Sequence, residues 1–504
     1  MQIESLDVSK PDVLRSILSL RNTSQPVNRL PPEILSRIAR HVLGRYDRDA
    51  RPIFPLTHVC RYWRESIVSA PENWILISDS CSDDLIALSL ERAKAAALEI
   101  SLSMNWVMQL PRLPGIITPH FQNVAALAVD SIPSFGEFTK VLPSFHQSLP
   151  NLRSLTLNVI HEEDWDLSID PFESLSHTLR YLKLTNIHLY PSFLRLRTLT
   201  ELSLTNSRFS LHLDTLLDFL EANDSLESVE LLIKFVEPSL RNSQRRAAIG
   251  NRLQRLYLRS WDPMGARALI ANIPLQKGGC LDISIGGAGL KEVLSGIPTT
   301  HLLNLPSPTF MEYRFTSERI RLQGPNGIFS FSGTRSRGGP FADLIDCPLI
   351  SLANVREVRM TISTYVIPPL SHLPAIETLV IQAKTSSLQS KSFVIPNHFI
   401  INISHILSAL LSNPASSPSL KTLVFLNCDD LSEDFMKKLT QFASIRQNTS
   451  TSARLCRVLI VHWEGRFPSV SSIQRLRNHV KIVDVRVGDD EVLTNSDIER
   501  YLAG

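Results

Sequence analysis

The fold of this chain is decided by residues 179–204, LRYLKLTNIHLYPSFLRLRTLTELSL. The stretch contains one frame twice, an apolar residue followed by apolar residues three and five positions later. The two copies are Leu179, Leu182 and Leu184, then Leu199, Leu202 and Leu204. In each copy the last two leucines alternate with polar residues, which predicts a short strand with one buried face. Because one such strand cannot bury its leucines alone, the frame predicts a stack of repeated units.

The frame recurs along most of the chain. After Ala97 it begins again at Val124, Leu152, Leu179, Leu199, Leu226, Leu253 and Cys280, and it returns at Val355, Ile376, Leu420, Leu455 and Val480. The common step of about 27 residues lies in the range typical of leucine-rich repeats. Segments such as residues 213–220, LDTLLDFL, have helical spacing. We therefore predict an irregular leucine-rich-repeat solenoid of the α/β class over residues 78–488, with parallel strands on its concave face and helices or loops on its convex face.

Residues 30–74, LPPEILSRIARHVLGRYDRDARPIFPLTHVCRYWRESIVSAPENW, predict a small helical unit before the repeats. Pro31 and Pro32 favour the entry to a helix, and Glu33 in its first turn suits the positive end of the helix dipole. Two amphipathic stretches follow, one on each side of a charged link. A unit of this size closes only a marginal core, so part of its apolar surface is expected to dock against a partner.

These residues resemble an F-box, particularly those of the expanded fungal families. The resemblance rests on an LPPEI start, a VCRYWR helix and a trailing APENW, and it covers the region we assign as residues 28–77. It implies a three-helix unit that binds the Skp-type adaptor of a cullin-RING ubiquitin ligase. The residues matching the apolar positions of the motif, and so the expected adaptor contacts, are Leu30, Pro31, Pro32, Ile34, Leu35, Ile38, Leu56, Val59, Cys60 and Trp63. Some of them must instead form the core of the unit.

Composition gives no sign of an electrostatic or membrane partner. The 504 residues are 43% hydrophobic and 20% charged with a net charge of +3, so we expect neither nucleic acid nor a membrane as partner. The polar start MQIESLDVSK is unlike a signal peptide, and no apolar run approaches about 18 residues. We therefore expect a soluble protein of the cytoplasm, the nucleus or both. Its six dispersed cysteines favour reduced thiols over a disulfide or zinc framework.

Segments outside the regular frame complete the expected organisation. Residues 1–27 include a short helical pattern. Near residues 306–340 the glycine- and proline-rich sequence predicts a loop-rich insertion with a hairpin at Gly324 to Gly327. Residues 489–504 are expected to form a helix that caps the last repeat.

Two clusters superficially suggest chemistry. The glycines at 286, 287 and 289 follow a strand-like segment but lack the GxGxxG order, so a repeat turn is the better interpretation. Residues 161–164, HEED, hold potential metal ligands without a second histidine at ligand spacing, so a solvated loop is favoured. We expect no catalytic residues, no metal site and no cofactor, although distant residues can assemble a triad that no motif reveals.

Strand alternation identifies candidate contacts for a protein substrate. Residues between the core leucines must point to the opposite, concave face. On that basis the candidates are Tyr181, Lys183, Glu201, Glu230, Arg255, Tyr257 and Arg259. Arginine and tyrosine are enriched among residues that dominate binding energy. If the Arg255 strand is not the receptor surface, the charged segment after Pro306 is the next candidate.

These expectations combine into a non-catalytic function. The F-box would bind the Skp-type adaptor of a Skp-cullin-F-box ubiquitin ligase, and the repeats would hold a protein substrate near the charged ubiquitin carrier. One alternative is an F-box scaffold that binds partners without delivering them for ubiquitination. Another is an enzyme built on the repeats, which a deep polar cleft with convergent titratable groups would reveal.

Overall fold

The structure is a computed structural model, and it is described here for the following residues: 11–44, 53–103, 117–132, 149–160, 177–187, 195–208, 213–234, 252–260, 263–273, 276, 278–286, 290–294, 308–314, 319–325, 327–333, 344, 350–362, 370–383, 404–413, 417–426, 432–450, 452–462 and 468–487. The chain divides into two compact units. The first comprises Met1–Leu211, Phe219–Leu226 and Leu232–Val236, and the second comprises His212–Asp218, Glu227–Leu231 and Glu237–Gly504.

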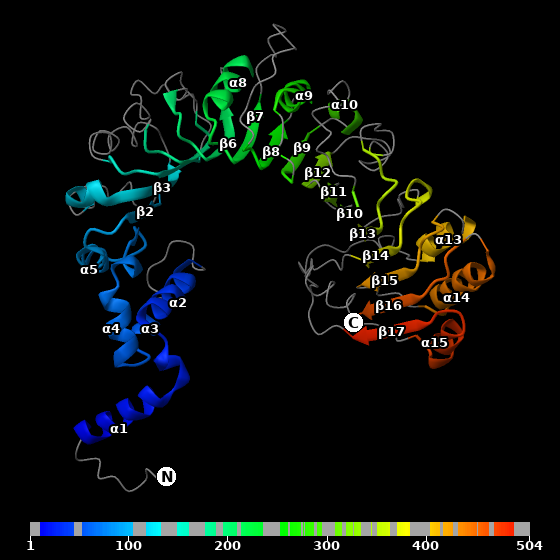
Figure 1. Cartoon of the computed structure of the whole chain (residues 1–504), viewed down its shortest axis with the longest axis horizontal. Coiled ribbons are helices and arrows are strands. Elements are labelled where there is room, and N and C mark those ends of the chain that lie inside the picture. The colour runs from blue at the N-terminus through cyan, green and yellow to red at the C-terminus, as the bar shows by residue number, and fades with distance from the viewer. Residues whose placement is uncertain are drawn as a thin grey trace, which may run out of the picture. The chain divides into compact units, whose positions relative to one another are not determined.

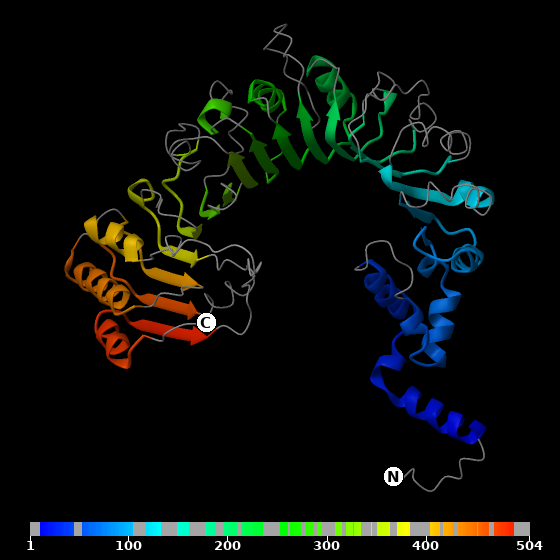
Figure 2. The same cartoon turned by 180° about the vertical axis from the view of Figure 1, so that it is seen from behind.

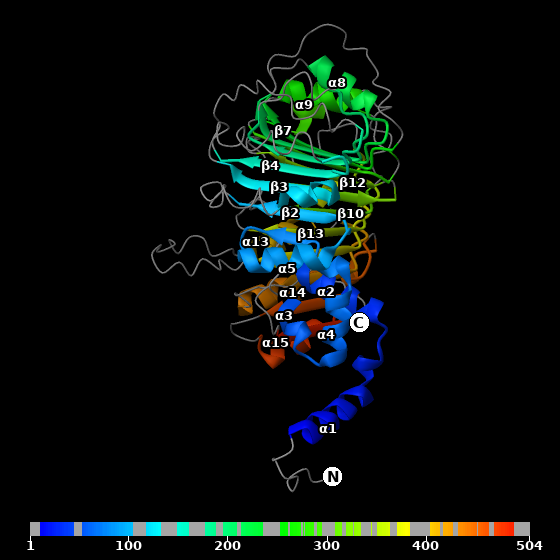
Figure 3. The same cartoon turned by 90° about the vertical axis from the view of Figure 1, so that its left-hand side faces the viewer.

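Short helices form the N-terminal part of the first unit. They are α1 (Pro11–Ser24), η1 (Pro26–Arg29), α2 (Pro32–Gly44), α3 (Ile53–Thr57), α4 (Arg61–Ser69) and η2 (Pro71–Asn73). Helices α2, α3 and α4 pack on one another around a core that includes Leu35, Ala39, Ile53 and Ile67. Helix α1 extends away from this group (Figure 3). We call α2, α3 and α4 the helical unit.

Trp74 joins the helical unit to the first repeat. Its indole Nε1 donates a hydrogen bond to the carbonyl of Ile67 at 3.2 Å, and its ring packs edge-on against Phe54. The guanidinium of Arg92 lies over the same ring, 4.3 Å from its centroid. Strand β1 (Leu76–Ser78) then pairs in parallel with β2 (Leu98–Leu102), with helix α5 (Asp83–Ala93) between them in the chain. Trp74 thereby takes the first apolar position of a repeat that our frame search missed.

The strands of the first unit pair in parallel in chain order. After β2 come β3 (Val124–Ile132), β4 (Ser154–Val159), β5 (Tyr181–Thr185) and β6 (Glu201–Arg208), each paired with the one before it. The predicted leucines stack across these strands, as Leu155, Leu182 and Leu202 do at equivalent positions. The 3-10 helix η4 (Thr118–Asn123) precedes β3. Asn223, at the end of α8 (Leu213–Ala222), is fully buried and links repeats by donating to the carbonyl of Leu196 and accepting from the amide of Leu199.

The second unit also contains a predominantly parallel sheet. Its strands are β8 (Arg255–Ser260), β9 (Cys280–Ile285), β10 (Phe310–Arg314), β11 (Arg319–Gly324), β12 (Gly327–Gly333), β13 (Glu357–Ile362), β14 (Thr378–Ala383), β15 (Thr422–Leu426), β16 (Arg457–His462) and β17 (Ile482–Val487). Strand β7 (Ser228–Lys234) has residues in both units. Repeated parallel strands with one buried apolar face confirm the predicted leucine-rich-repeat class.

Three strands of the second unit break the chain order. The spatial order is β9, β12, β11, β10, β13, with β11 antiparallel to both of its neighbours. The glycine-rich turn forms the expected hairpin between β11 and β12. Gly327 has a φ of +139°, and a Cβ there would collide with the carbonyl oxygen of Gly279, so only glycine fits. The segment expected to be loop-rich therefore contributes three strands to the sheet.

The register of one repeat differs from the prediction. Leu256 and Leu258 pair with Leu281 and Ile283, so the frame of β9 begins two residues before Cys280. The error arose because CLDISI offers three alternating apolar residues, and sequence alone does not say which pair stacks on the previous repeat.

Helices cover one side of the second unit's sheet. Helices α9 (Pro263–Asn272) and α10 (Leu290–Leu294) lie beside β8 and β9, and α13 (Ser404–Ser412), α14 (Glu433–Asn448) and α15 (Val470–Arg477) lie on the same side of β14 to β17 (Figures 1 and 2). The 3-10 helix η8 (Leu370–His372) precedes β14. Core residues Leu256 and Leu258 are fully buried.

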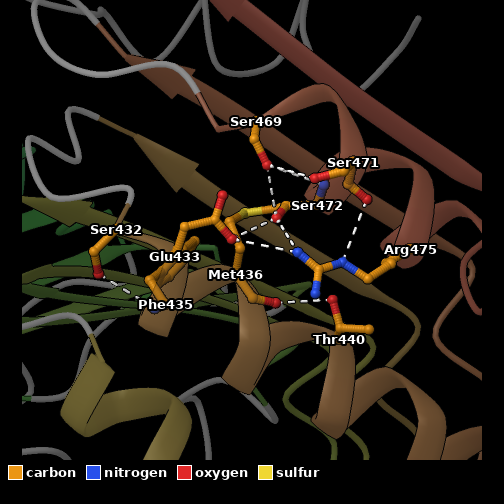
Figure 4. Close-up of polar contacts among 9 residues, drawn as sticks. All are labelled: Ser432, Glu433, Phe435, Met436, Thr440, Ser469, Ser471, Ser472 and Arg475. Carbon is orange, nitrogen blue, oxygen red and sulfur yellow. Dashed lines mark hydrogen bonds and ion pairs between the residues drawn. The ribbon is translucent and has the colours of Figure 1, made fainter.

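Polar contacts connect the last repeats. Ser432 and Ser469 cap the N-termini of α14 and α15, and Glu433 accepts a 2.6 Å hydrogen bond from the hydroxyl of Ser472 and pairs with Arg475 (Figure 4). Arg446 of α14 is enclosed completely. Its guanidinium donates to the carbonyls of Ser417, Pro418, Leu420 and Ala453.

Candidate interaction surfaces

The helical unit divides the residues predicted to contact an adaptor into exposed and buried sets. Pro31, Pro32, Ile34 and Val59 are exposed, with 36% of Ile34 and 51% of Val59 accessible. Leu30, Ile38, Leu56 and Cys60 are half-buried. Leu35 and Trp63 belong to the core of the unit. We therefore remove Leu35 and Trp63 from the predicted contact set, because an enclosed side chain cannot also cover a partner.

Hydrogen bonds hold the exposed residues in place. The indole of Trp63 donates to the side-chain oxygen of Asn28 at 2.7 Å, and the hydroxyl of Tyr62 donates to the carbonyl of Leu30 at 2.6 Å. These contacts pin the segment before α2 against α4. The amide of Ile34 then donates to the carbonyl of Pro31, which closes the first turn of α2. The exposed apolar residues are thus presented by an ordered scaffold.

Further apolar residues are exposed just before this surface. In α1, Leu18 and Leu20 are 45% and 71% exposed, and Val27 of η1 is 44% exposed. Sequence reasoning noted the helical pattern here but did not include these residues among the contacts. A signal was available, because three large apolar residues next to the motif exceed what this small unit can bury.

The predicted substrate contacts all occupy strand positions opposite the core leucines. In each unit, we call the face of the sheet opposite the core leucines the second face. In the first unit, Tyr181 and Glu201 are directly paired on β5 and β6, and Lys183 lies two residues along β5. In the second unit, Arg255, Tyr257 and Arg259 follow one another along β8. Arg255 and Arg259 are exposed, and the remaining five, including Glu230 of β7, are half-buried.

A charged cluster that sequence reasoning missed lies beside Tyr257. Asp282 of β9 is the direct partner of Tyr257, and the same row continues through Ser330 of β12 to Arg321 of β11. Asp282 forms an ion pair with Arg319. Burial raises the pKa of the Asp282 carboxyl, and the charges of Arg319, Arg259 and Arg321 oppose that rise. The reversed order of β10 to β12 creates this cluster, so no local motif could have indicated it.

The neighbouring Cys280 is not activated as a nucleophile. Burial raises the pKa of its thiol, and the charge of Asp282 raises it further, so the thiol stays protonated at neutral pH. Burial likewise raises the pKa of Tyr257. Both side chains are therefore protonated at neutral pH and can donate hydrogen bonds.

The charged cluster continues to β13. Glu312 of β10 is buried. In the strand register it lies directly opposite Arg321 of β11 on one side and Arg359 of β13 on the other. Arg359 also pairs with Glu357 at 2.7 Å, and its guanidinium lies 5.0 Å from the centre of the Phe310 ring. A cation stacked on an aromatic ring is held in place while keeping its charge.

The second face changes character at β14. Val380, Val424, Leu426, Leu459 and Val461 occupy second-face positions, yet they form a buried apolar cluster. The expectation that alternate residues point to an exposed face is therefore wrong for these strands. The signal was present in the sequence, since TLVFL and RVLIVH are nearly continuous apolar runs, typical of strands covered on both faces.

The described residues contain no group of three or more histidine, cysteine or acidic residues placed to hold a metal ion. None of their helices is long and apolar enough to cross a membrane. Cys60, Cys81, Cys280 and Cys456 are free thiols. Residues 161–164, 287–289 and the expected capping helix at 489–504 lie outside the described residues.

Comparisons with known proteins give no family assignment. No protein-family model and no curated protein matches the chain. The structure of an LRR protein from Leptospira interrogans aligns with 86% of this chain and 95% of its own, at 14% identity and a TM-score of 0.32. The crystal structure of the yeast Rad7 and Elc1 complex aligns with 98% of this chain and 96% of that chain, at 11% identity and a TM-score of 0.30. Similarity this distant does not bear on function.

Proposed function

We propose that this chain is a substrate-recognition adaptor of a Skp-cullin-F-box ubiquitin ligase. In this proposal α2, α3 and α4 form an F-box that binds the Skp-type adaptor, and the sheet holds a protein substrate. The chain itself is not an enzyme, and it works in the cytoplasm, the nucleus or both. The observation that carries the proposal is the exposure of Pro31, Ile34 and Val59 on a helical unit whose core is already closed by other residues.

The physical argument concerns which apolar residues remain available. The core of the helical unit is filled by buried side chains that include Leu35, Ala39, Trp63 and Ile67. Ile34 and Val59 keep 36% and 51% of their surface accessible, and large apolar side chains held rigidly at a surface favour association. They also occupy apolar positions of the motif that resembles an F-box. Placing a charge at either position would leave it unpaired in the apolar contact.

Direct binding to a purified Skp-type adaptor tests the proposal. We expect the double variant Ile34→Asp with Val59→Asp to lose about 100-fold or more in affinity, because each charge would be buried without a partner. Val470→Asp is the matched control, since Val470 is an exposed valine on α15. Unchanged affinity of a folded double variant would reject the F-box assignment. Trp63→Asp is unsuitable, because a charge in the core would unfold the helical unit.

Delivery of the substrate is a separate question. If the chain is a receptor, a protein bound to the sheet should be ubiquitinated when the complete ligase is reconstituted. A bound partner that is never modified would instead indicate a scaffold.

A further inference from the structure

The second face of the sheet is unusually rich in arginine between β8 and β13. Among the second-face residues of these strands whose side chains the structure describes, five arginines accompany three carboxylates. The arginines are Arg255, Arg259, Arg319, Arg321 and Arg359, and the carboxylates are Asp282, Glu312 and Glu357. We call this set the arginine field. It lies within a chain whose net charge is only +3, so the positive surplus is local.

We propose that the arginine field binds an acidic segment of a protein partner, with Arg259 and Arg321 as principal anchors. The inference rests on the proposed role of the sheet as a receptor surface, and it adds the chemistry of the substrate. Arginine suits this role because its planar guanidinium pairs with a carboxylate through two parallel hydrogen bonds.

The ion pairs within the arginine field involve Arg319 and Arg359 rather than the two proposed anchors. Arg319 pairs with Asp282, and Arg359 pairs with Glu357. Arg321 is half-buried, and its Nε has no hydrogen-bond partner among the residues that the structure describes. Arg259 is exposed, and its charge still acts on Asp282. Asp282 is therefore one carboxylate shared among several cations. The carboxylate of an incoming partner would neutralise positive charge on Arg259 and Arg321 that the single charge of Asp282 does not neutralise.

The composition of the field favours a peptide over nucleic acid. Three carboxylates are interleaved with the arginines. A peptide can place neutral residues opposite these carboxylates, whereas every nucleotide of a nucleic acid carries a phosphate charge. The aromatic rings of Tyr257 and Phe310 provide apolar contacts between the charges, as protein interfaces commonly do. The six strands span about 24 Å at a spacing of about 4.8 Å. An extended segment of about eight residues would cross them.

Fluorescence anisotropy with the full chain tests the inference. The probe is a labelled peptide of about twelve residues in which Glu alternates with Ala, compared with a matched peptide in which Gln replaces Glu. We expect the acidic peptide to bind about tenfold more tightly or better, and the preference to weaken as salt rises. Equal binding of both peptides would overturn the inference. Equally tight binding of single-stranded DNA of similar length would also overturn it, in favour of a general polyanion surface.

Two variants with opposite expected effects sharpen the test. Arg259→Gln with Arg321→Gln should weaken binding of the acidic peptide about tenfold or more, whereas Arg477→Gln on α15 should leave it unchanged. Asp282→Asn should strengthen binding about threefold, because it removes the competing carboxylate and releases Arg319. Weaker or unchanged binding of the acidic peptide by the Asp282→Asn variant would contradict the inference. This gain cannot be mistaken for a folding defect.

Adaptor binding measured on the same samples separates this inference from the proposed function. Loss of peptide preference with normal adaptor binding would reject only the arginine field. Normal peptide preference without adaptor binding would reject only the F-box assignment.

Discussion

Arg446 illustrates how a single residue can fasten irregular repeats together. Its side chain is fully enclosed, and burial lowers the pKa of its guanidinium. Arginine remains charged at neutral pH even so. The charge is tolerated because four backbone carbonyls accept hydrogen bonds from it, at distances between 2.9 and 3.1 Å. These carbonyls lie before β15 and before β16, so one side chain ties two connecting segments to α14.

Replacing Arg446 with methionine should therefore be strongly destabilising. Methionine fills much of the volume but leaves several buried acceptors without donors, at an expected cost of about 3 to 5 kcal/mol. Urea unfolding of the full chain provides the measurement. Arg477→Met, which alters an exposed arginine on α15, should change stability by less than about 0.5 kcal/mol. Equal stability of the two variants would show that the carbonyls find other donors.

At the scale of elements, the stability of the solenoid rests on leucines that stack from strand to strand. Leu182 and Leu256 are both fully buried, one in each compact unit. Truncation of either residue to alanine should lower the free energy of unfolding by about 2 to 5 kcal/mol. The cost is the lost free energy of burying the removed atoms plus the cost of the cavity that they leave. Denaturant unfolding of each variant would test this. A cost below about 1 kcal/mol at both positions would mean that the repeats collapse around the gap.

The contact between α14 and α15 predicts a dependence on pH. Hydrogen bonds from Ser469 and Ser472 lower the pKa of Glu433, and the charge of Arg475 lowers it further. Because this pKa is lower in the folded chain than in the unfolded chain, the stabilisation is present above the unfolded pKa of about 4.3 and is lost as pH falls through the folded pKa.

Comparison with Glu433→Gln isolates this contribution. We expect the wild-type chain to have the higher urea midpoint at pH 7, and the difference to disappear in acid below the folded pKa. A difference in urea midpoint that stays constant from neutral to acid pH would show that the substitution acts through packing and not through the charge of Glu433. Raising the salt concentration should also reduce it, since Glu433 and Arg475 are both exposed.

Sequence reasoning succeeded for elements wherever leucine marked the core. Every repeat frame coincides with a strand, although the frame at Cys280 is two residues out of register. Apolar residues that alternate with polar ones place one face of a strand in the core. Sequence reasoning failed for β10 to β12, where Met311, Phe329 and Phe331 occupy the core positions. Their spatial order is also reversed, and a repeat search assumes that chain order and sheet order agree.

At the scale of the whole molecule, we propose two kinds of surface for the recognition of partners. One is apolar and lies on the helical unit, and the other is charged and lies on β8 to β13. The sequence identified the first region and one strand of the second, at Arg255 to Arg259. It could not divide the helical residues into core and surface. Nor could it bring Arg319 and Arg321 to Asp282, since that depends on pairing between strands far apart in the chain.

Affinity capture with quantitative mass spectrometry, comparing the wild-type chain with two double variants, tests the central claim most directly. The wild type should retain a Skp-type adaptor and a cullin together with client proteins. Ile34→Asp with Val59→Asp should lose the adaptor and cullin but keep clients, whereas Arg259→Gln with Arg321→Gln should lose acidic clients but keep the adaptor. A folded wild-type chain that captures neither adaptor nor cullin would contradict the account, as would variants that lose both classes of partner together.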